Sequence, residues 1–172
     1  MACTQTLNGI VRDCEANAGG LKAIYIANKD DVSAITLGTG GDKISAITMA
    51  SSATFKPFYF KPGQASFTQE PQFNDAGDYV GENGVIDVNF GKMNTTKRAQ
   101  MAALSIGELI VIATDNNGIS WLFGYDNPVL RTGGTAESGA AKTDRNNYGL
   151  QLTSTDNQLA YEVPATILEG II

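Results

Sequence analysis

Histidine, the side chain most often used for acid–base catalysis near neutral pH, does not occur among the 172 residues of this chain. The sequence therefore excludes a Ser–His–Asp triad, a Cys–His pair, a His-ligated zinc site and an imidazole pH switch. Catalysis would have to use carboxylates, lysines, tyrosines or a thiol, and no recognisable motif arranges these groups. We therefore expect a protein that is not an enzyme, needs no cofactor or metal, and works through shape and contact.

The two cysteines, Cys3 and Cys14, are the only thiols. Two cysteines in a cytosolic product are usually reduced and buried, so we expect no disulfide. A short hairpin over residues 5–11 would let them face each other, which keeps the paired alternative open. A metal site would need two more ligands, and no histidine can supply them.

Three further patterns contain residue types found in ligand sites. Residues 38–43 (GTGGDK) lack the spacing of a phosphate-binding loop and precede a predicted strand, so we interpret them as a turn. Residues 115–118 (DNNG) lack the spacing and the terminal glutamate of a calcium loop, and hairpin chemistry explains them. Glycoside hydrolysis needs two carboxylates at a set separation, which the sequence does not establish for its candidate pairs, Asp75/Asp78 and Asp87/Glu108.

Composition indicates one folded domain over residues 1–172, since 42% of the residues are hydrophobic and 17% are charged. The net charge of −6 argues against a dominant basic groove for nucleic acid. An acidic surface would let nucleic acid slide past, and it would also simply keep the protein soluble. Because no signal-peptide pattern or long apolar run occurs, we expect cytosolic assembly and no membrane anchor.

Short strands between turn signals predict a mainly β fold. Pro62-Gly63 has the residues of a type II turn and predicts a hairpin joining residues 55–61 to 64–70. Pro57 lies inside the first arm, so that arm should be an edge strand or bend there. The alternation over 85–90 predicts one apolar and one wet face. The predicted strands are 5–11, 21–27, 44–50, 55–61, 64–70, 85–90, 108–114, 119–124, 148–153 and 158–163.

One α-helix is predicted over residues 95–106, flanking the sheets. Asn94 or Thr95 would cap its N-terminus, and Gly107 would end it in the left-handed conformation. Helical periodicity predicts a buried face of small and apolar residues, namely Ala99, Ala102, Ala103 and Ile106, widened by Met101 and Leu104.

The clearest hairpin joins residues 108–114 to 119–124 across the DNNG turn. Both faces of the first arm are apolar, which predicts a central strand, and Trp121 in the second arm is predicted to lie in the core. Residues 128–147 are predicted as a long polar loop, followed by a last hairpin of 148–153 with 158–163. The apolar C-terminal tail, 164–172, must dock on this core or on another subunit.

Three stretches resemble the tail-tube proteins of bacteriophages, as found among small virion proteins of phages of Bacteroides-type gut bacteria. The stretches are the opening MACTQTLNGIVRDCEANAGGLKAIYIAN, the block TTKRAQMAALSIGELIVIATDNNGISWLFG and the ending YGLQLTSTDNQLAYEV. The resemblance implies a β-sandwich or barrel with a long hairpin and one flanking helix. Six subunits would close their hairpins into a barrel, and stacked hexameric rings would form a channel for genomic DNA without sequence-specific binding.

The resemblance also implies which residues form the site. Two basic residues and a short hairpin depart from the family pattern, but the lining would come from Phe55, Lys56, Tyr59, Lys61, Gln64, Ser66, Thr68 and Glu70, with 85–90 in addition. Contacts between subunits would come from Arg131, Lys142, Arg145, Ile171 and Ile172. The implied partners are further copies of the chain and other tail and head proteins of a virion assembled in the bacterial cytoplasm.

Two other classes remain open. The chain could be a different virion structural protein, such as a head–tail connector ring, a capsid-stabilising protein or a fibre-attachment subunit. It could also be a soluble carbohydrate- or peptide-binding β-sandwich, for which Tyr59, Tyr79 and Tyr125 would provide the aromatic platform.

Overall fold

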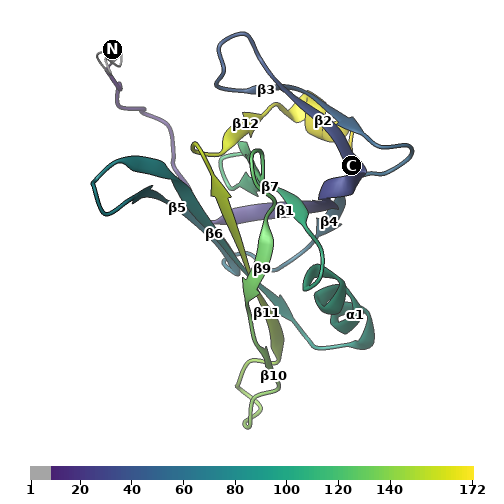
Figure 1. The fold of residues 1–172 in the computed structure, drawn as a ribbon. Coiled ribbons are helices and arrows are strands. Elements are labelled where there is room, and N and C mark those ends of the chain that lie inside the picture. Colours follow the sequence, from purple (N-terminus) through teal and green to yellow (C-terminus); the bar gives the residue numbers. More distant parts are fainter. Residues whose placement is uncertain (1–8) are drawn as a thin grey trace.

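A computed structural model describes residues 9–172 and shows a mainly β protein with two short α-helices (Figure 1). In chain order the elements are β1 (Leu21–Asn28), the 3-10 turn η1 (Lys29–Asp31), β2 (Val32–Leu37), β3 (Ile44–Met49), β4 (Lys56–Phe58), β5 (Ala65–Phe73), β6 (Tyr79–Gly91), α1 (Thr95–Leu104), β7 (Leu109–Asp115), β8 (Ser120–Phe123), β9 (Leu130–Gly133), β10 (Ala136–Glu137), β11 (Asn147–Asp156), β12 (Tyr161–Val163) and α2 (Ala165–Glu169).

Two five-stranded sheets and one separate hairpin make up the architecture. The core sheet has the order β12-β8-β7-β1-β4, and the open sheet has the order β10-β11-β6-β5, with β9 also pairing with β11. Strands β2 and β3 form a hairpin. This hairpin and α2 cover the face of the core sheet that points away from the open sheet (Figure 1). All of the strand pairs are antiparallel.

Strand β7 is central, as its two apolar faces predicted. Val111 and Ala113 pack between the core sheet and the open sheet, whereas Ile110 and Ile112 face the β2–β3 hairpin and α2. All four side chains are buried, so each face of β7 has its own hydrophobic cluster. The predicted hairpin with β8 is confirmed by the pairing of Val111 with Phe123 and of Thr114 with Ser120.

A β-bulge corrects the predicted faces of β1. Strict alternation puts Leu21 on the same face as Tyr25 and Ala27, but the register against β7 shifts between Leu21 and Ala23. The extra residue rotates Leu21 to the opposite face. Leu21 therefore packs with Ile24 and Ile26 in the cluster between the two sheets.

The helix α1 is present, but only the Met101 and Leu104 part of its predicted buried face is confirmed. Asn94 caps it by accepting a hydrogen bond from the Lys97 N–H (2.8 Å), and Met101 and Leu104 are its only buried residues. These two side chains pack beside the open sheet in the cluster between the sheets. The contact is narrow, so long side chains rather than alanines make it. The predicted stripe Ala99, Ala102, Ala103 and Ile106 is exposed instead.

Gly107 does not adopt the predicted left-handed conformation. The helix ends at Leu104: the Ser105 N–H donates to the Ala102 carbonyl (3.2 Å), and the Ile106 N–H donates to the Ala103 carbonyl (3.3 Å).

The predicted hairpin of residues 55–61 with 64–70 is also wrong. The Gln64 N–H does donate to the Lys61 carbonyl (3.1 Å), and Gly63 has a φ of +74°, as a turn at Pro62-Gly63 requires. The turn passes the chain from one sheet to the other, because β4 pairs with β1 and β5 pairs with β6. The long hairpin of the protein is therefore β5–β6.

The second half contains two similar corrections. Strand β11 lies in the open sheet, whereas β12 pairs with β8 in the core sheet, so residues 148–153 and 158–163 do not form a hairpin. The predicted loop 128–147 contains two short strands, β9 and β10, because both find hydrogen-bond partners on β11.

The C-terminal tail docks on its own core. Leu168 and Ile171 are buried in the cluster beneath α2, and the Phe55 N–H donates to the Ile171 carbonyl (2.8 Å). The first predicted strand is not found over residues 9–11, and its remainder lies outside the described residues, as does Cys3. Cys14 is exposed rather than buried.

Candidate functional site: the outer face and edges of the open sheet

The open sheet has one apolar and one polar face. The apolar face packs against the core sheet through buried residues that include Ile86, Val88, Leu150 and Leu152. The side chains of the opposite face are exposed or half-buried. We call this surface the polar face; its residues are Ser66, Thr68, Glu70, Val85, Asp87, Asn89, Thr132, Gln151 and Thr153. It contains two carboxylates and no lysine or arginine.

Side-chain hydrogen bonds run across the strands of the polar face. Gln151 donates from Nε2 to Asp87 Oδ1 (3.0 Å), and the hydroxyl oxygens of Thr132 and Thr153 lie 2.6 Å apart. At the end of the face, Asn147 donates from Nδ2 to Asn89 Oδ1 (3.0 Å). These contacts hold short polar groups flat against the sheet. The result is a hydrated surface of weak negative charge, which would repel phosphate groups rather than bind them.

Strand β5 leaves one edge of the open sheet without a partner strand in the described part of the chain. The Asn89 N–H donates to the Gln64 carbonyl (2.8 Å), so even-numbered residues of β5 bond to β6. The backbone groups of Phe67, Gln69 and Pro71 then point away from the sheet, since hydrogen-bonding direction alternates along a strand. Pro71 fits there because its missing N–H would have faced outward. Such an edge is a template for pairing with another chain.

The opposite edge is formed by β9 and β10, and no strand among residues 9–172 lies beyond either of them. The two strands are separated at Gly134-Thr135, where the Gly149 N–H donates to the Thr135 carbonyl (2.7 Å). Gly134 has a φ of +123°, and a Cβ there would collide with the Gly149 carbonyl. A glycine is therefore required to keep this broken edge against β11.

The predicted channel-lining residues separate into two groups. Ser66, Thr68 and Glu70 lie on the polar face, and Gln64 is half-buried at its end. The other four precede the turn at Pro62-Gly63 and so leave the open sheet: Lys56, Tyr59 and Lys61 are exposed, and Phe55 is 0% exposed. The prediction for Phe55 is wrong, because it fills the cluster between the core sheet and α2.

The predicted contacts between subunits also divide. Ile171 is 6% exposed and packs inside its own chain, so that prediction is wrong. Arg131 binds within the chain, donating from Nη1 to the Met101 carbonyl (2.8 Å) and to Ser105 Oγ (2.7 Å). Ile172, Lys142 and Arg145 are exposed, and their role in contacts between subunits stays a prediction.

Sequence reasoning missed several parts of this surface. Gln151 and Thr153 alternate with the buried Leu150 and Leu152, and this period of two was a usable signal. The partner strand of residues 148–153 was wrongly assigned, which hid their place on the polar face. Pro71 was a usable signal for the free edge of β5.

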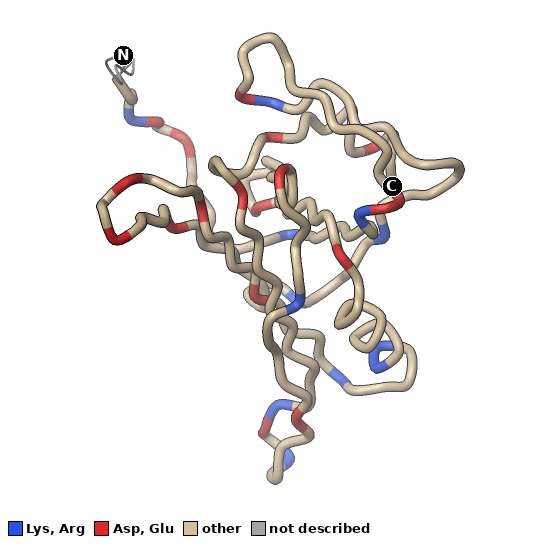
Figure 2. Tube along the Cα trace, in the orientation of Figure 1, with Lys and Arg blue, Asp and Glu red and all other residues tan. Residues whose placement is uncertain are grey.

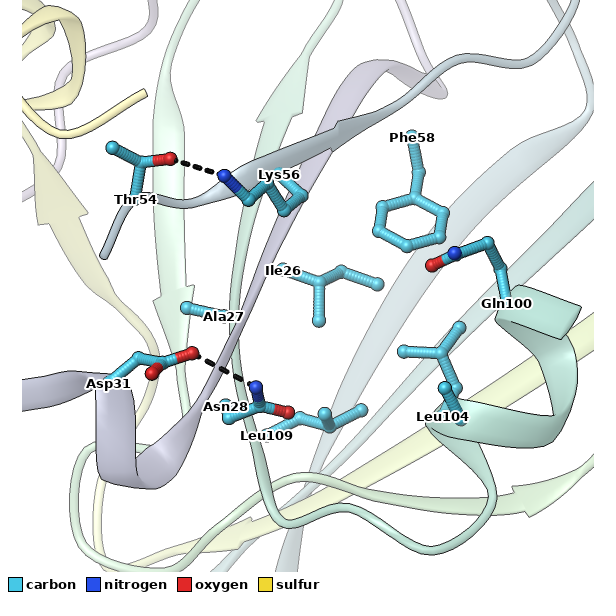
Figure 3. Close-up of a pocket in the computed structure, with 11 residues that line it drawn as sticks. Ile26, Ala27, Asn28, Asp31, Thr54, Lys56, Phe58, Gln100, Leu104 and Leu109 are labelled. Carbon is cyan, nitrogen blue, oxygen red and sulfur yellow. Dashed lines mark hydrogen bonds between the residues drawn. The ribbon is translucent and has the colours of Figure 1, made fainter. Parts of the chain in front are cut away.

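Metal-ligating side chains are dispersed over the part of the chain that the structure describes. Within residues 9–172 no three histidine, cysteine, aspartate or glutamate side chains gather to hold a metal ion. A cavity between α1 and strands β1 and β4 encloses about 190 Å³, with Ile26, Phe58 and Leu104 around it (Figure 3). This volume is below the range of about 300–1,000 Å³ typical of small-molecule sites, whereas a cavity beside Tyr79 and Tyr161 (about 330 Å³) and one lined by Lys61 and Lys92 (about 510 Å³) lie within it.

Four of the five polar side chains around the cavity between α1, β1 and β4 bind one another in pairs, and Gln100 is the fifth. Asn28 donates from Nδ2 to Asp31 Oδ2 (2.9 Å), and Lys56 donates from Nζ to Thr54 Oγ1 (2.7 Å) (Figure 3). Elsewhere, desolvation raises the pKa of Tyr79, and its hydrogen bond to Glu82 raises that pKa further. Desolvation also raises the pKa of Tyr161, helped by the charge of Asp126. Both shifts favour neutral tyrosines, which are not nucleophiles.

No family model, curated protein or solved structure matches this chain. In the part of the chain that the structure describes, no helix is long and apolar enough to cross a membrane.

Proposed function

We propose that this chain is a non-enzymatic structural subunit of a virion, and specifically a tail-tube subunit that forms stacked hexameric rings around a DNA-conducting channel. The observation that supports it most is the open sheet, which combines a polar outer face with two unpaired edges. A monomer gains nothing from unpaired edges, because each invites uncontrolled pairing. Closing a ring of subunits removes both edges at once.

The two edges favour a head-to-tail contact. β5 is a continuous strand of nine residues, whereas β9 and β10 form an interrupted edge, so the two edges are unlike. Unlike surfaces on one molecule join heterologously, and a heterologous contact closes into a ring when its rotation allows. In the proposed ring, β5 of one subunit pairs with β9 and β10 of the next.

The polar face would then line the channel. The core sheet covers the apolar face of the open sheet, so the polar face is the one free to point inward. Its uncharged side chains, with the carboxylates of Glu70 and Asp87, would let DNA pass without being held. Such a wall agrees with the absence of tight, sequence-specific DNA binding that we propose.

Exposed apolar groups elsewhere also support assembly. Ile106 at the end of α1 is 91% exposed, next to the exposed alanines of that helix. The N-terminal arm, residues 9–17, leads away from the body (Figure 1) and exposes Ile10 by 101% and Val11 by 85%. Contacts between neighbouring subunits would remove these groups from water.

Two alternatives predict different results. A head–tail connector or capsid-stabilising protein would form single rings or bind a shell, but would not stack into tubes. A soluble carbohydrate-binding sandwich is favoured by one observation, the exposed pair of Phe73 and Tyr79, whose ring centroids lie 6.1 Å apart. Such a protein would stay monomeric, and Tyr79→Ala would abolish its binding to a glycan array.

The free edge of β5 offers a matched test. Gln69→Pro removes only an outward N–H from the backbone, as Pro71 already does two residues later, and it leaves the bonds to β6 intact. Gln69→Ala loses the same side chain, including its hydrogen bond from the Ala160 N–H, but keeps the backbone N–H. Light scattering and negative-stain microscopy should show rings or tubes for the wild type and Gln69→Ala, and monomers for Gln69→Pro. Equal assembly of both variants would contradict pairing at this edge, and a wild type that stays monomeric at high concentration, even when seeded, would contradict the tube.

A further inference from the structure

A basic cavity lies at one end of the polar face. It encloses about 510 Å³, and the charged residues that line it are Lys61, Lys92 and Arg145, with no carboxylate among the lining residues. The other lining side chains are amides, Gln64, Asn89, Asn146 and Asn147. Antiparallel pairing explains the cluster: β5 begins, β6 ends and β11 begins at this same end of the sheet.

The three cations are unpaired. None of them forms an ion pair or a side-chain hydrogen bond within residues 9–172, where the one ion pair joins Lys43 to Glu162 (2.7 Å). All three are exposed, and Figure 2 shows basic residues near this end of the sheet, at the loop after β10 and beside α1. A protein with a net charge of −6 has many carboxylates with which to pair its cations. Three like charges around one cavity instead create a local positive potential that attracts an anion.

The backbone around the cavity is fixed in an uncommon conformation. Lys92 has a φ of +61°, in the left-handed region that non-glycine residues seldom adopt. Asn146 holds it there, because its carbonyl accepts from the Lys92 N–H (2.7 Å) and its Oδ1 accepts from the Met93 N–H (2.8 Å). These bonds also bring Lys92 close to the segment before β11 that contains Arg145. Strained residues of this kind are frequent at functional sites.

A fourth lysine, Lys97, occupies two backbone carbonyl oxygens close to the cavity. Lys97 Nζ donates to the carbonyl oxygens of Gly91 and Lys92. These two oxygens would otherwise add negative character beside the cavity. With them occupied, the cations of Lys61, Lys92 and Arg145 dominate it.

We propose that Lys61, Lys92 and Arg145 form a binding site for the backbone phosphates of a nucleic acid. Lysine and arginine are the usual donors to phosphate, and such contacts read no sequence. The site is continuous with the polar face, because Asn89 belongs to both. The role of this site within a tube rests on the proposed function. In such a tube, each ring would bind DNA at one end of its channel, and the weakly acidic wall of the rest of the channel would not bind it.

The test compares two triple variants with the same change in charge. Lys61→Gln/Lys92→Gln/Arg145→Gln removes the site, and Arg12→Gln/Lys22→Gln/Lys29→Gln removes as many charges elsewhere. Fluorescence anisotropy with a double-stranded DNA of random sequence, repeated over a range of salt concentrations, gives the affinity and its salt slope. Three phosphate contacts predict a slope of log K against log salt of about −2.7, since each contact contributes about −0.9.

The wild type and the control should bind DNA with this slope, and the site variant should lose it together with at least tenfold in affinity at low salt. Equal binding by both variants would overturn the proposal. The proposal would also be overturned if the wild type binds no DNA and the site variant fails to assemble. In that case the cavity would bind carboxylates of another copy of the chain. Arg145→Gln alone, in an exposed loop, provides a second variant should the triple variant not fold.

Microscopy of the same samples separates the two proposals. Rings or tubes without salt-dependent DNA binding would remove this site and leave the proposed function. DNA binding through the three residues without any assembly would keep the site and remove the tube.

Discussion

The core sheet and the open sheet share one apolar interior, but they differ in how far their faces are exposed to water and in how their edges are protected. The core sheet is covered on both faces, by the open sheet on one side and by the β2–β3 hairpin and α2 on the other. Its edge strands, β4 and β12, have three residues each. Pro57 blunts the first, and the ion pair between Lys43 and Glu162 lies beside the second.

The open sheet has fewer of these protections: Pro71 lies on its β5 edge and β9 and β10 are short, but β5 itself is long. One of its faces is wet, and its edge strand β5 runs for nine residues with β6 on one side and no strand of residues 9–172 on the other. The comparison teaches that one chain separates two tasks. The core sheet is covered within the chain, whereas in the proposed ring the edges of the open sheet would pair with other copies.

The largest expected effect is in the core sheet. Ile112 is fully buried at its centre, so Ile112→Ala should lower the free energy of unfolding by about 4 kcal/mol through lost burial and a cavity. Urea unfolding followed by circular dichroism measures this loss. Thr153→Ala on the polar face is the control, and it should change the free energy by at most about 1 kcal/mol. Equal losses would mean that the two sheets do not divide stability and assembly.

The next effect concerns the connection between the sheets. Asp156 at the end of β11 is buried, and its carboxylate accepts from the backbone N–H groups of Gly124 (2.9 Å), Asp126 (2.9 Å) and Asn127 (3.2 Å). Asp156→Ala should cost about 3 kcal/mol, because it leaves buried donors unpaired. Asp156→Asn keeps one oxygen acceptor and should cost less in the same urea titration. A cost below about 1 kcal/mol for Asp156→Ala would show that the sheets hold together through apolar contacts alone.

Trp121 gives a smaller effect than full burial would. It is half-buried on β8, packs against the cluster between the sheets, and donates from Nε1 to Asp115 Oδ2 (3.3 Å). Full burial predicts a loss of about 3–5 kcal/mol for Trp121→Ala, and half-burial reduces this to about 2 kcal/mol. Trp121→Phe should recover most of the loss. Thermal unfolding of both variants would show whether side chains near the edge of the core sheet contribute as much to stability as fully buried side chains at its centre.

The smallest effect is a local pH dependence in the loop between β10 and β11. Hydrogen bonds from the Ala141 and Ala140 N–H groups lower the pKa of Asp144. A lowered pKa means that the charged form is favoured in the folded loop. Its contribution is therefore present above the unfolded pKa and is lost as the pH falls through the folded value. In an NMR titration, the amide shifts of Ala140 and Ala141 should move below the ordinary aspartate pKa, and Asp144→Asn should abolish this movement.

The sequence predicted the strands well and their partners poorly. Local alternation identified β1, β7 and β8 and predicted one apolar and one wet face for residues 85–90, because the period of two is a property of a single strand. Pairing over long distances leaves no comparable local signal. The turn at Pro62-Gly63 formed as predicted, but it passes the chain between the sheets, so four of the eight proposed lining residues lie outside the open sheet.

The helix shows the same limit. Its existence and its Asn94 cap follow from local chemistry, whereas the face that it buries depends on a sheet whose strands come from distant parts of the chain. The basic cavity also depends on register, since its three cations are far apart in the sequence. Without the pairing of β5, β6 and β11, nothing indicated that they would meet.

The unlike edges of the open sheet have a consequence for mixtures of subunits. A Gln69→Pro molecule retains a sound β9–β10 side, so in the proposed ring it can still join one neighbour while offering nothing to the next. A small fraction of this variant in a mixture would terminate growing assemblies. It would therefore reduce ring formation by more than its share of the subunits. A variant that is defective at only one of its two edges would therefore inhibit assembly of the wild-type protein in a mixture. A variant that fails to fold would not join the ring and would leave wild-type assembly unchanged.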